Sequence, residues 1–169
     1  MAEKLSLRDY QRDLAERLRA AEGGRLASLL ALQIGHEGWL VDLADAGEVI
    51  PVPAITPVPL ARPWFKGMAN IRGNLFSVVD FPAFLGGAPV ALNEQSRLLL
   101  IGERFRMGAA LLVDRSLGLR NPAQLKSAEA GEGAPAWVKA QYSDQEGRAW
   151  KELDLAQLVQ QQEFLNVGV

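Results

Sequence analysis

The fold of this 169-residue chain is decided by residues 65–81, which read FKGMANIRGNLFSVVDF. Two apolar segments, Met68–Arg72 and Leu75–Phe81, lie on either side of Gly73-Asn74. Apolar runs around a two-residue Gly/Asn turn are typical of a β-hairpin, because these residues adopt the backbone angles that the tightest hairpin turns require. The stretch therefore predicts a hairpin whose second strand ends at an aspartate, Asp80.

Short apolar segments with the length of β-strands lie on both sides of this hairpin. Before it, residues 26–34 and 39–43 flank a turn, and Glu48–Val52 is a third expected strand. After it we expect the strands Arg97–Gly102, Phe105–Val113, Trp137–Tyr142 and Ala149–Leu153. Many short strands separated by close turns predict an all-β (mainly β) fold built from small barrels. The order lacks the alternation of strands and helices that characterises a doubly wound α/β sheet.

Helices are expected essentially at the ends of the chain, with one short turn at Asn121-Pro122. In residues 6–22 apolar side chains recur every three or four positions, which predicts an amphipathic helix: Leu7, Tyr10, Leu14, Leu18 and Ala21. We assign residues 1–24 to this N-terminal helix and 25–169 to the β domain. The apolar stripe should be buried, on the barrels or on a partner.

The C-terminal third is expected to contain a loop and a closing helix. Residues 129–135 include two glycines, which predicts the most mobile loop of the chain. Asp154 has the residue type and position of a helix N-cap. The helix behind it should pack through its apolar residues, Leu155, Leu158, Val159 and Leu165.

A proline cluster separates the third strand from the hairpin, with Pro51, Pro53, Pro57, Pro59 and Pro63. Proline cannot donate a hydrogen bond to a sheet, so this segment should be extended, irregular chain along a sheet edge. A proline-rich ligand for an SH3 domain is the alternative. The interleaved apolar residues indicate packing instead: Val52, Ile55, Val58 and Leu60.

Composition narrows the classes of function. The 18 basic and 20 acidic residues give a formal charge of −2, which provides no basic surface for nucleic acid or an anionic membrane. No apolar run reaches the roughly 18 residues of a membrane-spanning helix, and the first residues do not resemble a signal peptide. We therefore expect a cytoplasmic protein. The absence of cysteine excludes disulfides and thiolate metal sites.

Catalytic constellations are not apparent. A Ser–His–Asp triad would have to use His36, the single histidine, which lies in a glycine-flanked turn typical of a solvated side chain. The segment Gly67–Gly73 lacks the Gly-Lys-Ser/Thr ending of a phosphate-binding loop. Asp80 and Asp114 could pair as catalytic carboxylates, but an aspartate at a strand end more often accepts hydrogen bonds from the following turn. We expect no enzyme activity, no cofactor and no metal.

Residues 65–81 strongly resemble the signature of CheW-like domains, in which an apolar-Gly-apolar-x-Asn-apolar-Arg-Gly hairpin leads into a Val-Asp-apolar strand. The surrounding order agrees at Trp39-Leu40-Val41-Asp42, at Gly47-Glu48-Val49-Ile50 and at Leu112-Val113-Asp114. The resemblance extends from about Leu26 to the C-terminus. The segment Gly-Met-Ala-Asn-Ile-Arg-Gly, with a tryptophan shortly before it, is most similar to that of members from twitching-motility systems.

The resemblance implies two intertwined, five-stranded SH3-like β barrels and a role without catalysis. It implies an adaptor in chemotaxis or type IV pilus (twitching-motility) signalling, with one lobe binding the regulatory domain of a CheA-type histidine kinase. The groove region would meet the tip of a methyl-accepting chemoreceptor. This chain departs from the family pattern at residues 44–46, on the strand that meets the receptor, and at residues 116–118.

The resemblance also implies a partner-binding set: Glu48, Gly67, Asn70, Arg72, Gly73 and Asp114. We expect the Arg72 side chain to project outward from the hairpin, where a guanidinium can make several directed contacts. Glu48 should lie close enough to interact with it. Two other functions stay open. A small-ligand-binding β protein would contain a deep apolar cavity. An enzyme would contain a cleft with perturbed carboxylates.

Overall fold

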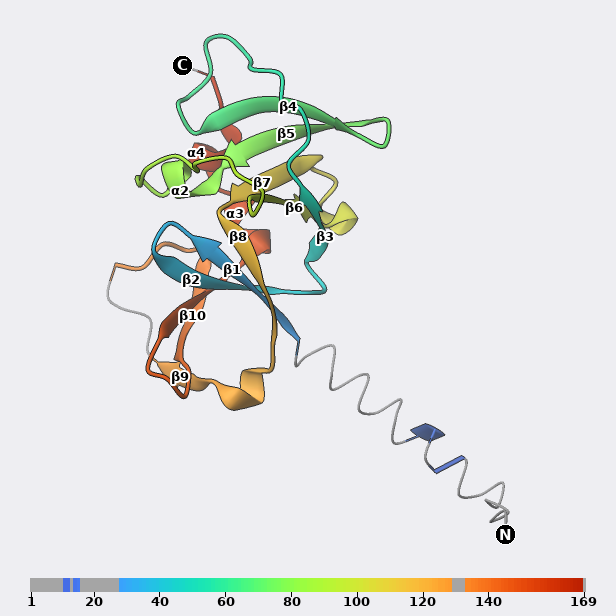
Figure 1. Ribbon diagram of the computed structural model, residues 1–169, viewed down its shortest axis with the longest axis vertical. Coiled ribbons are helices and arrows are strands. Elements are labelled where there is room, and N and C mark those ends of the chain that lie inside the picture. The colour runs from blue at the N-terminus through green and yellow to red at the C-terminus, as the bar shows by residue number, and fades with distance from the viewer. Residues whose placement is uncertain (1–10, 13, 16–27, 129–132, 169) are drawn as a thin grey trace.

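The structure is a computed structural model that describes residues 11–12, 14–15, 28–128 and 133–168. Two β lobes lie one above the other in Figure 1, and each is built on one antiparallel-rich sheet. The expectation of a mainly β chain is confirmed. One sheet has the five strands expected and the other has six.

The six-stranded sheet is made from both ends of the β domain, in the order β8-β1-β2-β11-β10-β9. Its strands are β1 (Leu29–Ile34), β2 (Glu37–Asp42), β8 (Arg115–Arg120), β9 (Lys126–Ala128), β10 (Val138–Ser143) and β11 (Ala149–Leu153). β2 pairs in parallel with β11, with Gly38 opposite Trp150. This pairing joins the first and last parts of the β domain in one sheet, and the chain between them forms the other lobe.

The five-stranded sheet is made from the central part of the chain, in the order β3-β6-β7-β5-β4. Its strands are β3 (Ala46–Pro51), β4 (Phe65–Ile71), β5 (Asn74–Asp80), β6 (Arg97–Ile101) and β7 (Ala109–Val113). The chain enters this lobe between β2 and β3 and leaves it between β7 and β8. The two lobes are therefore intertwined, as the family resemblance implied.

The largest apolar core lies between the lobes and takes residues from both sheets. It includes Trp39 of β2, Leu111 of β7 and Phe81 of the short helix α2 (Phe81–Phe84), each no more than 2% exposed. Trp39 and Phe81 meet edge to face, with ring centroids 5.7 Å apart. Because both sheets contribute to one core, neither lobe buries its apolar face without the other.

The remaining helices are short. They are the 3₁₀ turns η1 (Glu103–Phe105) and η2 (Pro122–Gln124), and the helices α3 (Leu155–Leu158) and α4 (Gln162–Leu165). The prediction of one closing helix is wrong, because the chain breaks into two between Leu158 and Gln162. Asp154 is the N-cap predicted, and its side chain accepts a hydrogen bond from the Gln157 amide. Leu165 is 52% exposed, and the neighbouring Phe164 packs in its place.

The central hairpin turns one residue earlier than the sequence pattern predicts. Ile71 pairs with Asn74, so the two turn residues are Arg72 and Gly73, whose φ angles are 52° and 84°. Two successive positive φ angles match the twist of a right-handed hairpin, which explains why this turn is preferred over one centred on Gly73-Asn74. Arg72 therefore stands at the very tip.

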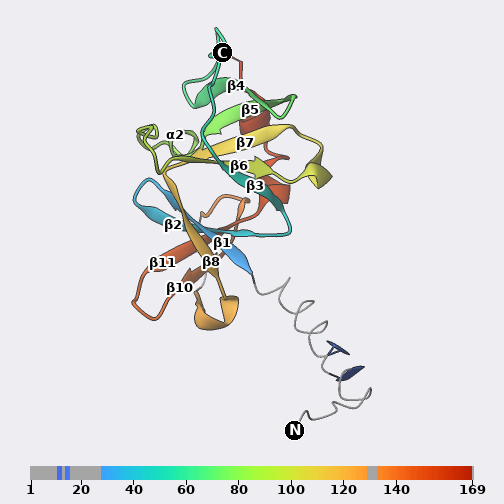
Figure 2. The same cartoon turned by 45° about the vertical axis from the view of Figure 1, so that its right-hand side comes forward.

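The proline-rich segment lies along β4, as expected, through a bridge between Thr56 and Met68. Val52 and Ile55 pack against the core of the five-stranded sheet. The prediction that Val58 and Leu60 also pack is wrong, because they are 41% and 84% exposed. The segment arches beyond the edge of the sheet at these positions, beside the C-terminus (Figure 2).

Most of the predicted N-terminal helix lies outside the described residues. The four that are described, Gln11, Arg12, Leu14 and Ala15, are helical and exposed. Residues 129–132 of the predicted mobile loop also lie outside the described part. Within the described residues, no helix has the length and apolarity needed to cross a membrane.

Candidate partner-binding surface

Arg72 and Glu48 form a two-point ion pair at the end of the central hairpin. The Nη1–Oε2 distance is 2.8 Å and the Nη2–Oε1 distance is 2.6 Å. Hydrogen bonding to the guanidinium lowers the pKa of Glu48, and the same contact raises the pKa of Arg72. The Glu48 side chain is 44% exposed and the Arg72 side chain is 71% exposed, so both also face solvent. The expectation that these residues lie close together is confirmed.

Local contacts fix the turn that carries Arg72 and the position of its partner Glu48. The Asn70 side chain accepts a hydrogen bond of 2.9 Å from the Gly73 amide, which closes the turn locally. On the other side, β3 pairs with β6 through a register shift between Ala46 and Val49, and Glu48 lies within it. Such a bulge redirects side chains, and here it accompanies a carboxylate placed against the hairpin tip.

A groove of about 630 Å³ lies beside this ion pair. Its apolar lining comes from β4, β5, β6 and the turn before β7: Ile71, Leu75, Phe76, Leu100, Ile101 and Met107. Leu75 is 62% exposed. Four charged side chains also line the groove: Glu48, Arg72, Glu103 and Arg106. An apolar patch bordered by charges is the arrangement expected of a protein-docking surface.

Residues 102–108 form one wall of the groove. Arg104 makes an ion pair with Asp45 and lies over the Phe105 ring, 4.6 Å from its centroid. The Gly102 amide donates to the Asp45 carbonyl at 3.0 Å. Burial raises the pKa of Asp45, and Arg104 opposes that effect. These contacts tie the wall to the start of β3, next to Glu48.

Gly67 belongs to the partner-binding set implied by the resemblance, but the structure places it inside the fold. It is buried in β4, with φ of 137°. A Cβ built there would lie 2.0 Å from the Thr56 carbonyl oxygen and 2.9 Å from Pro57 Cα. Glycine is therefore required so that the proline-rich segment can approach β4. Gly67 therefore has a structural role, because it lets residues 56–57 pack against β4.

Asp114 also lies away from the hairpin tip. It follows β7, and its Oδ2 accepts a hydrogen bond of 2.6 Å from the Gly35 amide in the turn between β1 and β2. Its own amide donates to the Gln33 carbonyl at 3.1 Å. Asp114 therefore joins the crossing between the lobes to the six-stranded sheet. Four of the six residues gather at the hairpin end: Glu48, Asn70, Arg72 and Gly73.

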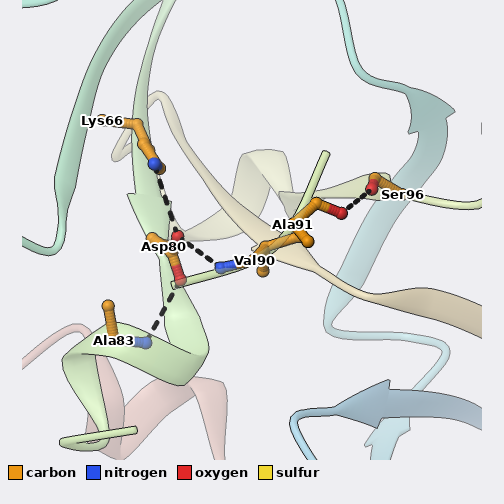
Figure 3. Close-up of polar contacts among 6 residues, drawn as sticks. All are labelled: Lys66, Asp80, Ala83, Val90, Ala91 and Ser96. Carbon is orange, nitrogen blue, oxygen red and sulfur yellow. Dashed lines mark hydrogen bonds and ion pairs between the residues drawn. The ribbon is translucent and has the colours of Figure 1, made fainter. Parts of the chain in front are cut away.

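Asp80 is a completely buried carboxylate with a structural position (Figure 3). One oxygen accepts from the Ala83 amide at 3.1 Å, and the other accepts from the Val90 amide at 2.9 Å. Lys66 Nζ lies 3.7 Å away. Asp80 thus caps α2 and fixes the chain that returns to β6, as expected of a strand-end aspartate. In the described part of the chain, no group of three or more histidine, cysteine or acidic residues is arranged for a metal.

Sequence reasoning missed the wall at residues 102–108 and the exposed Leu75. The segment was expected to join β6 to a long strand from Phe105, but β7 starts at Ala109. Two glycines, Gly102 and Gly108, bracket a charged run there and are the signal that could have indicated a loop. Arg106 adopts φ of 50° in this turn.

Comparison with known proteins agrees with this fold. The CheW-like domain family model matches residues 28–163. Protein PilI of Pseudomonas aeruginosa is 31% identical over 117 residues, which are 64% of this chain and 65% of PilI. Chemotaxis protein CheW of Thermotoga maritima is 32% identical over 92 residues, 54% of this chain and 59% of that protein. The chain thus spans slightly less than two thirds of the length of these curated relatives.

A solved structure supports the architecture independently. The scaffolding protein TtCheW from Thermoanaerobacter tengcongensis superposes with a TM-score of 0.64 over 76% of this chain and 89% of that one, at 18% identity. At that identity the likeness concerns the fold. The similarity to PilI agrees with the resemblance to twitching-motility members. The family model covers most of the sequence, and the chain therefore belongs to the CheW-like domain family.

Proposed function

We propose that this chain is a non-enzymatic, cytoplasmic adaptor that couples a methyl-accepting chemoreceptor to a CheA-type histidine kinase. The proposal is supported by membership of the CheW-like family over residues 28–163 and by the relatives named PilI and CheW. The identity to PilI favours a type IV pilus (twitching-motility) system over a swimming one. The adaptor acts by holding two proteins together and uses no cofactor.

The observation that carries the proposal is the exposed, pre-ordered Arg72 at the hairpin tip. An ion pair between solvent-exposed groups contributes little to folding. This one is nevertheless held by two hydrogen bonds and by a tight turn, beside an apolar groove. A fixed guanidinium next to apolar surface is typical of the residues that dominate protein interfaces. The best use of this arrangement is contact with a partner.

The N-terminal segment extends the proposal. Residues 1–24 form an amphipathic helix in our assignment, ahead of the CheW-like domain at 25–169. Leu14, one of its described residues, is 46% exposed. An apolar stripe is suited to docking on a partner helix or surface, and the exposed Leu14 agrees with that use. We propose that this segment adds to partner binding.

The test measures folding and binding separately in variants of the ion pair. Arg72→Ala and Arg72→Glu should melt within about 2 °C of the unaltered protein, because exposed pairs add little stability. Both should weaken binding to the purified kinase regulatory domain or to a receptor signalling fragment, Arg72→Glu by tenfold or more. The double change Arg72→Glu with Glu48→Arg should recover part of the loss.

The matched control is Lys126→Glu, which makes the same change of charge at an exposed position on β9 of the other sheet. It should leave both binding reactions unchanged. If Arg72→Glu binds both partners as tightly as Lys126→Glu does, the hairpin tip is not a partner-binding surface and the proposal loses its main support.

A further inference from the structure

The tip of the proline-rich segment, Pro57–Leu60, presents four exposed residues without a charged side chain. Leu60 is 84% exposed, the largest value among the bulky apolar residues that the structure describes. A single exposed leucine needs no explanation, but four adjacent apolar residues form a projecting patch. Burial in the fold does not account for this patch.

Leu60 also has an unfavourable backbone conformation, with φ of 56°. A side chain with a Cβ is disfavoured there, and asparagine or glycine is the usual occupant. Among the described residues, the two other non-glycine positions with positive φ are Arg72 and Arg106, which both line the groove beside the hairpin. Backbone strain concentrates at functional positions. Leucine at position 60 is explained neither by packing, because the side chain is exposed, nor by the backbone conformation, which favours asparagine or glycine.

The base of this tip is firmly held. On one side, Thr56 and Met68 exchange two backbone hydrogen bonds of 2.8 and 2.9 Å. On the other, the Arg62 amide donates to the Val167 carbonyl at 2.8 Å, next to the bridge between Ala61 and Gly168. The tip is therefore fixed before any partner arrives, which reduces the entropy lost on binding.

We propose that Leu60 is the apolar anchor of a second protein-binding surface, and that it inserts into a leucine-sized apolar pocket bordered by a carboxylate on a folded partner domain. The tip itself carries no charge, and the exposed Arg62 follows two residues after Leu60 and donates from its Nε to the Asn166 carbonyl. This supplies one positive charge at the edge of the contact. One arginine in a chain of net charge −2 is a poor match for an anionic membrane.

The tip is distinct from the hairpin surface. The proline-rich segment leads into one end of β4, and the turn that contains Arg72 follows the other end (Figure 1). A seven-residue strand spans roughly 20 Å, which separates the two surfaces. The inference rests on the proposed function in one respect: an adaptor must bind two proteins at once. The apolar groove beside Arg72 is concave and suits a helix of the receptor tip, whereas a projecting leucine requires a pocket on the other partner. We therefore assign Leu60 to the kinase regulatory domain.

The experiment uses the full chain and its Leu60→Asn variant with the purified kinase regulatory domain. Asparagine tolerates the left-handed conformation, so the variant should melt at the same temperature as the unaltered protein or higher. Its affinity for the kinase domain should fall at least tenfold, while its affinity for the receptor fragment stays unchanged. Leu92→Asn, at a leucine that is 57% exposed elsewhere, is the matched control and should bind normally.

The outcomes separate this inference from the proposed function. If the unaltered chain binds neither protein, the adaptor function itself is wrong. If it binds the kinase domain and Leu60→Asn binds equally well, only the role of Leu60 is wrong. Self-association of the unaltered chain that Leu60→Asn abolishes would assign the tip to a second copy. Sedimentation with phosphatidylglycerol vesicles that depends on Leu60 would assign it to a membrane. Either result overturns the proposal.

Discussion

Replacing Gly67 by alanine should destabilise the protein far more than the same change at Gly73. Both glycines have positive φ angles, 137° and 84°, so alanine is strained at both positions. The surroundings differ. A Cβ at Gly67 would lie 2.0 Å from the Thr56 carbonyl oxygen, whereas a Cβ at Gly73 would meet no atom within 4 Å.

The size of the effect follows from these contacts. At Gly73 only the backbone strain remains, which costs about 1–2 kcal/mol. At Gly67 the proline-rich segment must also move, which loses the two hydrogen bonds between Thr56 and Met68, at about 1 kcal/mol each. Overpacking adds about 1–3 kcal/mol. Together with the backbone strain, we expect a total of about 4–7 kcal/mol for Gly67→Ala.

Melting curves followed by circular dichroism provide the assay. For a chain of this length, 1 kcal/mol corresponds to about 2–4 °C in Tm. Gly67→Ala should therefore melt at least 8 °C below the unaltered protein, and Gly73→Ala by a few degrees. If the two variants melt at the same temperature, the close approach of residues 56–57 to β4 is not what requires glycine at position 67.

Three further outcomes are expected. Asp80→Ala should lower stability by about 2–4 kcal/mol in urea unfolding, because it leaves the buried Val90 amide without its acceptor; an unchanged midpoint would contradict this role. The Trp150 indole holds the pKa of Asp144 below 3.8, so the carboxylate stabilises the fold above that pH and loses this effect as pH falls. Asp144→Asn should therefore lower Tm at pH 7 and make a smaller difference at pH 3; equal differences would exclude the linkage. Deleting residues 1–24 should weaken partner binding or lower Tm, and a truncated chain that melts and binds normally would leave the apolar stripe without a role.

The strands that sequence reasoning placed correctly have strong local signals. The central hairpin was placed correctly except that its turn lies one residue earlier, because apolar runs and a turn with positive φ angles act within a few residues. Asp80 and Asp154 behave as expected for the same reason, since a carboxylate satisfies the amides that follow it directly along the chain. Such features depend little on the rest of the fold.

The features that were missed depend on tertiary context. β8 is exposed at nearly every position and contains Gly118, so its sequence carries no alternating pattern, and it exists because β1 offers an edge. Val58 and Leu60 were expected to pack because apolar residues between prolines usually do. Their exposure is decided by where the segment leaves the edge of β4, which no local pattern encodes.

The candidate site was predictable in part. The meeting of Glu48 and Arg72 followed from the family resemblance, and the structure confirms it. Gly67 and Asp114 were grouped with them because the resemblance does not separate residues that face a partner from residues that hold the fold. The burial of Gly67 and the bond from the Gly35 amide to Asp114 make that separation.

The most direct test of the adaptor function is receptor control of kinase activity in a reconstituted system. Receptor signalling fragments in vesicles, the CheA-type kinase and this chain are combined, and autophosphorylation of the kinase is measured. We predict that receptor-dependent activity requires the unaltered chain, is lost with Arg72→Glu and is partly recovered with Arg72→Glu and Glu48→Arg together. Receptor-dependent activity that is the same without the chain, or with Arg72→Glu in its place, would contradict the account.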